Sequence, residues 1–459
     1  GDIKRVNGKG EIMTFETKGK ENNGATYGRR SDWQDLYSIA KKYYEALLAD
    51  PGNAQFHLTD PRGASDKSGR TFNNPYQYFF EQMHMDDAIY ADESIYEYPM
   101  QQGGGNDGRP YSFGRPSSGG SKAAYPCKSY GQGRINPAYF YGVFDPNDMR
   151  RDVSITMTGS NGKGVEKLIP FVPNSKAEGG GLTLNKWDEN RQANPWVAAQ
   201  RKSGINGPYM RMSEVYLGYA EVCAALGDVV TGKQYLKTVR ERSFPQGLAN
   251  TDAFIASFGN DLVRAIIEER GFEYAGEGDR RWTLIRSGYL PEDIKRIKDM
   301  TKAMMDGLAT KGYYEFENGN IISAYIWTKL VDAKTIYGHR LTAQCPTDKV
   351  NDPVLYPGWR GQKDNWEEMG LNYGSSTPAT NLAIKGLFEI VSEEEAASLE
   401  SQGYAKVNWG IDLVDYRDEY DKYLFWDYDY VSAPIYLWPF TPNVMAAGGF
   451  TNGYGFKQE

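Results

Sequence analysis

The sequence predicts a mainly α-helical protein with long loops and a few small strands. Apolar residues recur every three or four positions between Ser31 and Asp50, and again over about 210–310. Between about 59 and 209 they come in short groups separated by Gly, Asn, Pro and Ser, which predicts that this part of the chain is mostly loop.

We expect one large domain at 31–459 after an irregular arm at 1–30, because the arm shows no apolar periodicity. Three regions follow one another within this domain. They are a loop-rich region at about 59–209, a helical region at about 210–310 and a second loop-rich region at about 311–459. Long loops in a compact chain are usually functional, so the first loop-rich region is the expected ligand region.

The first predicted helix runs from Ser31 to Asp50. Ser31 or Asp32 can cap its start, and Asp50-Pro51-Gly52 can stop it. Its apolar face contains Trp33, Leu36, Tyr37, Ala40, Tyr44, Leu47 and Leu48.

A helix hairpin is predicted between residues 211 and 242. Its first helix ends at Gly227-Asp228, and Thr231 can cap the second helix. The pair resembles a single tetratricopeptide unit, and we expect it to dock on a third helix at 261–274. The side chains expected in the shared core are Val215, Tyr219, Leu226 and Ile266.

Shorter elements are expected elsewhere in the chain. The sequence predicts a helix from Pro291 to Leu308 and a short helical segment from Glu393 to Leu399. Strand-like alternation appears at Glu93–Tyr98, Val153–Met157 and Ile321–Tyr325.

Composition excludes several classes of function. A formal net charge of −8 argues against a nucleic-acid partner, because phosphate binding needs clustered Lys and Arg. The three cysteines and three histidines lie apart from one another, so no disulfide scaffold or metal site is expected. There is no P-loop, GxSxG, HExxH or dinucleotide fingerprint after a strand, and no cofactor is expected. No apolar run is long enough to span a bilayer, and an export signal would have to lie upstream of Gly1.

Four segments carry more specific information. Residues 211–221 read RMSEVYLGYAE, residues 266–282 read IIEERGFEYAGEGDRRW, and residues 144–150 read FDPNDMR. Residues 437–454 begin with LWPFT and end with NGY. In this combination the four segments resemble the signature elements of the SusD/RagB family, with Thr283 where the family usually has Asp.

This resemblance implies a SusD-like helical body and a non-catalytic role. Such a protein is lipid-anchored on the outer face of a Bacteroidota-type outer membrane, through a precursor segment that this sequence does not contain. It captures an oligo- or polysaccharide and delivers it to a TonB-dependent, SusC-like transporter. RagB-like members take up peptide instead, so peptide is the alternative cargo. The helices that the family places near its N-terminus are not visible in this sequence.

The charged residues of the motifs are interpreted as ion pairs that join helices. The alternative is an enzyme, a helical glycoside hydrolase or lyase, in which Glu269 and Glu273 act as an acid/base pair. Residues four apart on one helix point the same way, whereas glycoside hydrolysis needs carboxylates on opposite sides of the scissile bond. We therefore expect no catalysis by this pair.

Candidate ligand-binding residues are aromatic side chains of the first loop-rich region. A sugar ring offers C–H faces that stack on aromatic rings and hydroxyls that bond to amides and carboxylates. The chain holds 34 Tyr and 10 Trp, more than a core needs. A structural surface protein without a ligand would instead bury these rings. The residues selected for stacking are Tyr111, Tyr130, Tyr139, Trp187 and Trp196.

Overall fold

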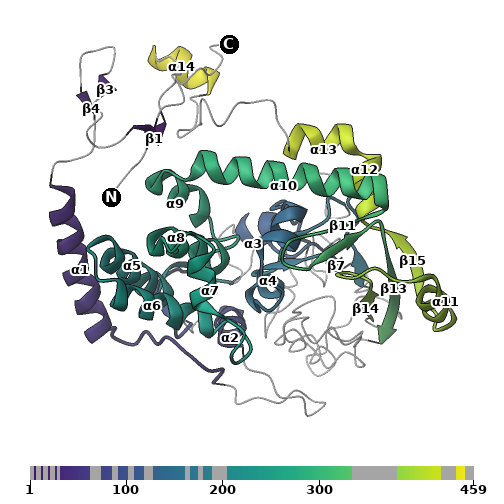
Figure 1. Ribbon diagram of the computed structural model, residues 1–459, viewed down its shortest axis with the longest axis horizontal. Helices are drawn as coiled ribbons and strands as arrows, with labels where there is room; N and C mark the ends of the chain where they lie inside the picture. The colour runs from purple at the N-terminus through teal and green to yellow at the C-terminus, as the bar shows by residue number, and fades with distance from the viewer. Residues whose placement is uncertain are drawn as a thin grey trace.

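The computed structural model confirms a mainly helical body with small sheets (Figure 1). It describes residues 5–6, 12–13, 19–20, 26–27, 32–61, 74–84, 91–101, 108–117, 128–160, 166–173, 179–188, 204–332, 380–424 and 441–449.

Helix α5, Met212–Ala225, lies at the centre of the predicted hairpin region. It packs against α1 (Trp33–Ala49), α6 (Val229–Glu241) and α8 (Leu262–Glu273) (Figure 1). The first helix, the hairpin and its docking on the third helix are thus confirmed.

The predicted shared core of these helices needs a correction. Val215 is buried, but it packs with Tyr44 and Leu48 of α1. Tyr219 contacts both neighbours, because its ring meets Tyr235 of α6 edge to face at 4.7 Å and its hydroxyl donates to Glu45 Oε1 of α1 at 3.1 Å. Leu226 is only half-buried. Helix α5 is covered on two faces, so its apolar pattern could not tell which neighbour lies on which side. The core shared with α6 and α8 contains Leu217, Ala220, Leu236, Val239, Leu262, Ala265 and Ile266.

The ends of these helices follow from specific residues. Gly227, at a φ of 87°, takes the left-handed conformation just after α5 and ends it as predicted. The cap of α6 is Asp228 and not Thr231, because the Asp228 carboxylate accepts the backbone N–H of Thr231 at 3.2 Å. Asp261 caps α8 in the same way through the N–H of Arg264, at 3.0 Å.

The remaining helices surround this body and extend it towards the C-terminus. Helix α10 begins at Leu290, one residue before the predicted start at Pro291, and confirms the predicted helix. Helix α11 confirms the helical segment predicted from Glu393. The bounds are α2 Pro75–Gln82, α3 Gly108–Phe113, the π-helical turn η1 Tyr139–Val143, α4 Arg150–Ser154, α7 Thr251–Ala256, α9 Asp279–Ser287, α10 Leu290–Lys311, α11 Glu393–Ser401, α12 Gly410–Asp415, α13 Arg417–Leu424 and α14 Pro442–Gly448.

The strands form small antiparallel sheets. Three strands pair in the order β14 (Thr380–Lys385), β13 (Tyr325–Asp332) and β15 (Ala405–Asn408). The two-stranded pairs are β1 (Arg5–Val6) with β2 (Ile12–Met13), β3 (Gly19–Lys20) with β4 (Thr26–Tyr27), β5 (Ser94–Tyr98) with β10 (Gly207–Arg211), β6 (Ile155–Thr156) with β9 (Thr183–Leu184), β7 (Thr158–Ser160) with β8 (Glu166–Leu168), and β11 (Tyr313–Glu315) with β12 (Ile321–Ser323).

Two strand predictions are confirmed and one is wrong. The alternation at Glu93–Tyr98 becomes β5, and Ile321–Tyr325 contains β12. The segment Val153–Met157 is split instead, because α4 continues to Ser154 and only two residues then join β6. A five-residue pattern was too short to distinguish a helix end from a strand.

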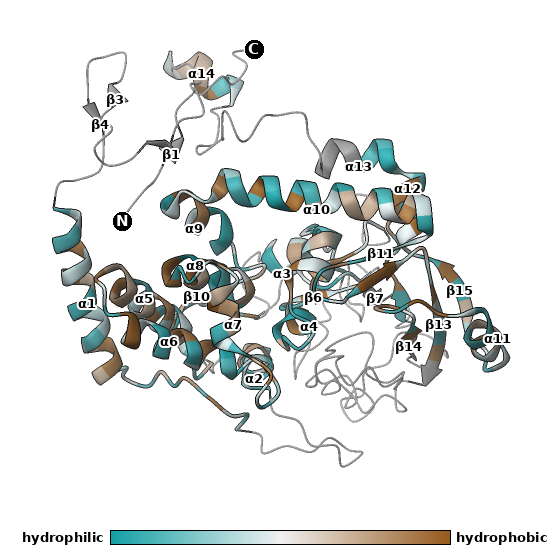
Figure 2. Ribbon diagram, viewed as in Figure 1, coloured by the Kyte–Doolittle hydropathy of each residue, from teal (hydrophilic) through white to brown (hydrophobic). Residues whose placement is uncertain are grey.

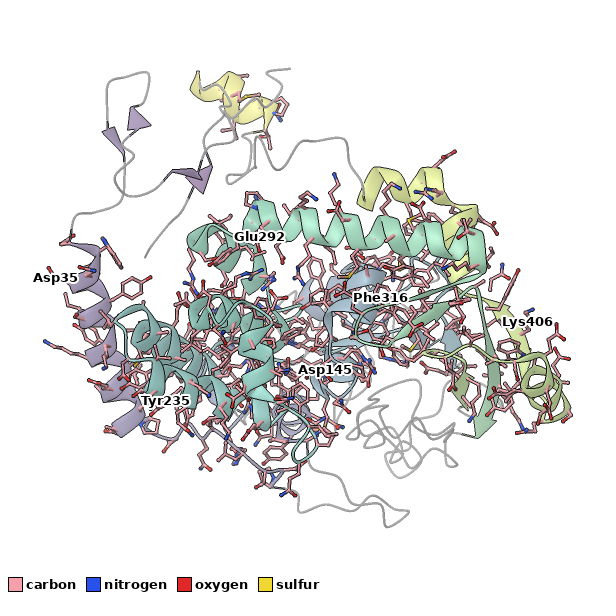
Figure 3. All side chains as sticks on the ribbon, viewed as in Figure 1. Asp35, Asp145, Tyr235, Glu292, Phe316 and Lys406 are labelled. Atoms are coloured by element: carbon pink, nitrogen blue, oxygen red, sulfur yellow. The ribbon has the colours of Figure 1, made fainter. Side chains whose placement is uncertain are left out.

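A second apolar core lies beneath α10 and the three-stranded sheet. It joins the π-helical turn to the sheet, and its largest member, Trp409, is fully buried and donates to the Tyr141 hydroxyl at 2.8 Å. Phe316 points into this interior, whereas Lys406 lies at the outer edge of β15 (Figure 3). Apolar residues concentrate where helices and the sheet pack together (Figure 2). No helix within the described ranges is long and apolar enough to cross a membrane.

Candidate functional site

Charged residues of the sequence motifs meet in a buried ionic cluster at the C-terminal half of α8. The Arg211 guanidinium donates to Glu93, Glu273 and Glu277, with its Nη1 at 2.9 Å from Glu93 Oε1 and 2.5 Å from Glu273 Oε1. Arg242 Nη2 reaches the same Glu273 oxygen at 2.8 Å. These contacts join the end of β10, the end of α6 and α8 to the residue before β5, as the ion-pair interpretation predicts.

A second set of contacts adds α4 to the ionic cluster. Arg150 binds the Asp148 carboxylate through Nε and Nη2, at 2.9 and 2.7 Å. Its Nη1 lies 2.7 Å from Glu269 and 3.0 Å from Glu273. The FDPNDMR segment therefore positions a guanidinium against two carboxylates of the second motif.

Neighbouring guanidinium groups keep Glu273 and Glu268 ionised. Burial alone would favour the protonated form of Glu273, but Arg211, Arg242 and Arg150 outweigh burial and hold the pKa of this carboxyl well below its usual range. Burial likewise opposes ionisation of Glu268, and Arg280, Arg296 and Arg264 lower its pKa to about 2. A general acid needs a raised pKa so that it still carries its proton near neutral pH, and neither carboxyl group meets this condition.

The ionic cluster also positions the β5–β10 pair. Glu93 precedes β5 and Arg211 ends β10, so both strands are tied to α8 at the same end. The inward Glu97 carboxylate accepts from the Ala91 N–H at 2.9 Å and from Asn206 Nδ2 at 2.8 Å. Side chains alternate along a strand, so burying Glu97 turns its neighbours Tyr96 and Tyr98 to the opposite face.

The outer face of this pair carries three exposed tyrosines, Tyr96, Tyr98 and Tyr209, which we call the tyrosine surface. Their side chains are 56%, 56% and 75% exposed. Tyr209 lies where the register shifts between Pro208 and Met210, and this bulge turns it outward beside Tyr96. The Tyr96 and Tyr209 rings meet edge to face with centroids 5.5 Å apart. Such rings offer open apolar faces beside phenolic hydroxyls, the combination that sugar recognition uses.

Sequence reasoning missed the tyrosine surface, although a signal was present. The predicted strand at Glu93–Tyr98 already implied that Tyr96 and Tyr98 share one face. The position of Tyr209 depends on a β-bulge, which the sequence does not predict.

The selected aromatic residues mostly lie in the interior. Tyr111 and Trp187 are only 5% and 3% exposed, and Tyr139 is half-buried with its hydroxyl donating to the Gly271 carbonyl at 2.8 Å. Their rings are covered by protein, which does not suit stacking on a sugar. Tyr130 is half-buried, edge-on to Tyr111 at 5.0 Å, and Trp196 lies outside the described residues.

Burial of these rings is what the structural-protein alternative predicted for them. The exposed rings of the tyrosine surface argue against that alternative. They lie within the predicted ligand region at 59–209. Loop composition did not identify which aromatic rings are exposed, because composition does not indicate which rings anchor loops.

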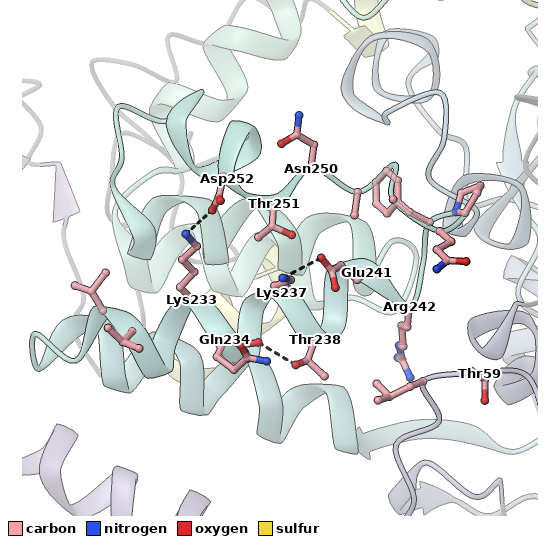
Figure 4. Close-up of a pocket in the computed structure, with 18 residues that line it drawn as sticks. Thr59, Lys233, Gln234, Lys237, Thr238, Glu241, Arg242, Asn250, Thr251 and Asp252 are labelled. Carbon is pink, nitrogen blue, oxygen red and sulfur yellow. Dashed lines mark hydrogen bonds and ion pairs between the residues drawn. The ribbon is translucent and has the colours of Figure 1, made fainter.

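A separate groove of about 1250 Å³ runs along α6 beside α7 (Figure 4). Each of its charged side chains has an ionic partner, and Arg242 pairs with Glu93 and Glu273 of the ionic cluster. Lys233 pairs with Asp252, and Lys237 Nζ lies 3.6 Å from Glu241. The groove is thus lined by neutralised pairs and holds no partnerless carboxylate pair that would suggest glycoside hydrolysis. No group of three or more His, Cys, Asp or Glu in the described part of the chain is arranged to hold a metal ion.

Comparison with known proteins identifies the family. A sequence profile of the SusD family matches residues 55–439. The chain belongs to this family, as its four motifs suggested. Of the 437–454 motif, the structure describes residues 441–449, which contain α14.

Individual relatives are distant. A SusD-like protein, P25, from Formosa agariphila is 28% identical over 160 residues, which cover 35% of this chain and 26% of that protein. A SusD homologue from Bacteroides thetaiotaomicron is 17% identical with a TM-score of 0.39, over 60% of this chain and 56% of that one. Surface glycan-binding protein A from Bacteroides thetaiotaomicron, solved with laminarihexaose, is 18% identical with a TM-score of 0.38, over 57% and 52% of the two chains. The chain thus spans only part of each relative.

Proposed function

We propose that this chain binds an oligo- or polysaccharide at the cell surface without chemically changing it, and that the tyrosine surface is where the sugar rings stack. The observation that carries this proposal is the exposure of three tyrosines on one face of a sheet held by buried ion pairs. An open face needs no chain end and suits a long polymer passing across it.

The family's general role supports the rest of the proposal. A lipid-anchored protein on the outer face of the outer membrane would pass captured glycan to a SusC-like, TonB-dependent transporter. The alternatives are peptide as cargo, as for RagB-like members, and a helical glycoside hydrolase or lyase. Glu269 and Glu273 are buried in ion pairs with arginines, which argues against an enzyme that uses these two carboxylates.

Affinity gel electrophoresis against a panel of soluble polysaccharides tests the proposal. We expect at least one polysaccharide to retard the protein and Tyr209→Ala to weaken that retardation, with an unchanged melting temperature. Tyr43→Ala is the matched control, because Tyr43 is 70% exposed but belongs to α1 and not to the β5–β10 pair.

Two results would overturn the proposal. Retardation by no polysaccharide, together with saturable binding of a peptide mixture, would establish the peptide alternative. Release of new reducing ends from a retarding polysaccharide would establish an enzyme.

A further inference from the structure

The two strands of the tyrosine surface are joined by different contacts at their two ends. Ion pairs of Arg211 hold the end where β5 begins and β10 finishes. At the opposite end Gly207 pairs with Tyr98, and the side chain of Asn206, the residue before β10, bridges to β5.

Asn206 bonds to a buried carboxylate that has neutral donors. Glu97 is 3% exposed, and its carboxylate accepts from the Ala91 N–H, the Ser94 hydroxyl and Asn206 Nδ2. Within the described part of the chain, no Lys, Arg or His forms an ion pair with it. A buried charge that is held by hydrogen bonds alone is strongly destabilised when it loses a donor. Of these three donors, only Asn206 comes from the β10 side of the strand pair.

The Asn206 amide uses both its donor and its acceptor. Its Nδ2 lies 2.8 Å from Glu97 Oε2, and its Oδ1 accepts the Met100 N–H at 2.8 Å. Tyr98 lies between these two contacts along the chain, and Tyr209 belongs to the strand that begins directly after Asn206. The amide therefore holds the chain on both sides of Tyr98 against the start of β10.

We propose that Asn206 is a positioning residue for glycan binding, which holds Tyr98 and Tyr209 in the arrangement that stacks on one sugar chain. This inference rests on the proposed glycan-binding function and extends it to a buried side chain that does not touch the ligand. Rings that are already in place lose less conformational entropy when a ligand binds.

Asn206→Asp tests the role of the amide because it keeps the size of the side chain and removes its donor. It places a second carboxylate against Glu97, and two like charges at this distance repel each other. Isothermal titration calorimetry with the polysaccharide that best retards the parent measures the effect. We expect the affinity to fall about thirtyfold, the loss expected when two of the three rings no longer stack.

Exchanging the two polar groups should restore binding. In the double variant Glu97→Gln/Asn206→Asp, an amide at position 97 donates to a carboxylate at position 206. The donors of Ala91, Ser94 and Met100 keep oxygen acceptors in the same places. We expect most of the lost affinity to return.

Two controls separate positioning from a general loss of stability, with every variant measured well below its melting temperature. Asp228→Ala removes the cap of α6 and should lower the melting temperature without changing the affinity. In a Tyr98→Ala/Tyr209→Ala background, Asn206→Asp should weaken binding no further, because the rings that it positions are absent.

Failure of the positioning role can be distinguished from failure of the proposed function. If the parent binds, an unchanged affinity of folded Asn206→Asp protein, or a double variant that binds no better than Asn206→Asp alone, would overturn the inference while glycan binding stands. A further loss of affinity in the background without the two rings would also overturn it. Binding of no polysaccharide by the parent would overturn both.

Discussion

At the scale of single residues, the carboxylate of Glu273 joins α8 to three other parts of the chain. This carboxylate forms ion pairs with Arg211 of β10, Arg242 at the end of α6 and Arg150 of α4. Removing one charge from such a buried set leaves uncompensated guanidinium groups. Its role is to hold the body together, and we do not place it in ligand contact.

We therefore expect Glu273→Gln to lower the free energy of unfolding by about 3–5 kcal/mol, the usual cost of breaking a buried ion pair. Glu241→Gln is the control, because the Glu241–Lys237 pair is exposed and such pairs contribute about 1 kcal/mol or less. Urea unfolding measures both. Weaker glycan retention by folded Glu273→Gln protein at an unchanged melting temperature would contradict the structural role.

Glu268 makes the stability depend on pH. Its pKa is about 2 in the folded protein, against an ordinary value of 4.5. Below pH 4.5 the unfolded chain takes up the proton first, so the stabilisation is complete above pH 4.5 and is lost as the pH falls towards 2. Its full size is on the order of 3 kcal/mol.

Urea unfolding of the parent and Glu268→Gln at several pH values tests this dependence. The difference in unfolding free energy between them should be large at pH 7 and shrink steadily between pH 4.5 and 2. A difference that stays constant over this range would show that Glu268 does not carry the effect.

At the scale of elements, the sequence located helices better than it located their contacts. Hydrophobic spacing predicted α1, α5, α6, α8 and α10, because each packs apolar residues of one face against its neighbours. It could not show that α5 is buried on two faces, and it did not predict α9, whose charged sequence DRRWTLIRS is helical through packing and ion pairs such as that of Arg280 with Glu268.

The candidate site was less predictable than the helices. Tyr111 and Trp187 were selected for lying among polar loop residues, yet both are buried. Their burial depends on contacts between distant segments, which composition does not contain. Strand alternation could show that Tyr96 and Tyr98 share one face. It could not show that this face is exposed, because that depends on the burial of Glu97 against the Ala91 N–H and Asn206.

The cap of α6 offers a test at this scale. Asp228→Ala should lower the unfolding free energy by about 1 kcal/mol, because the N–H of Thr231 loses its side-chain acceptor. Asp228→Ser keeps an oxygen at the cap and should recover most of the loss in thermal unfolding. If Thr231→Ala were the more damaging substitution, the assignment of the cap to Asp228 would be wrong.

At the scale of the whole molecule, buried ion pairs join the helical body to the strands of the tyrosine surface. The buried charges that join the helices also hold Glu93 and Arg211, and these residues fix the ends of β5 and β10. Stability and ligand binding should therefore separate under mutation: substitutions in the ionic cluster affect folding, and substitutions on the tyrosine surface affect binding.

The most direct test of the account is the affinity of a variant with Tyr96, Tyr98 and Tyr209 all replaced by Ala, measured by isothermal titration calorimetry with the polysaccharide that best retards the parent. If each ring contributes about 0.5–1.5 kcal/mol, as aromatic pairs do, the affinity should fall roughly a hundredfold. The melting temperature should stay close to that of the parent, because all three rings are exposed. An unchanged affinity in the folded triple variant would contradict the central claim that glycan binds on the tyrosine surface.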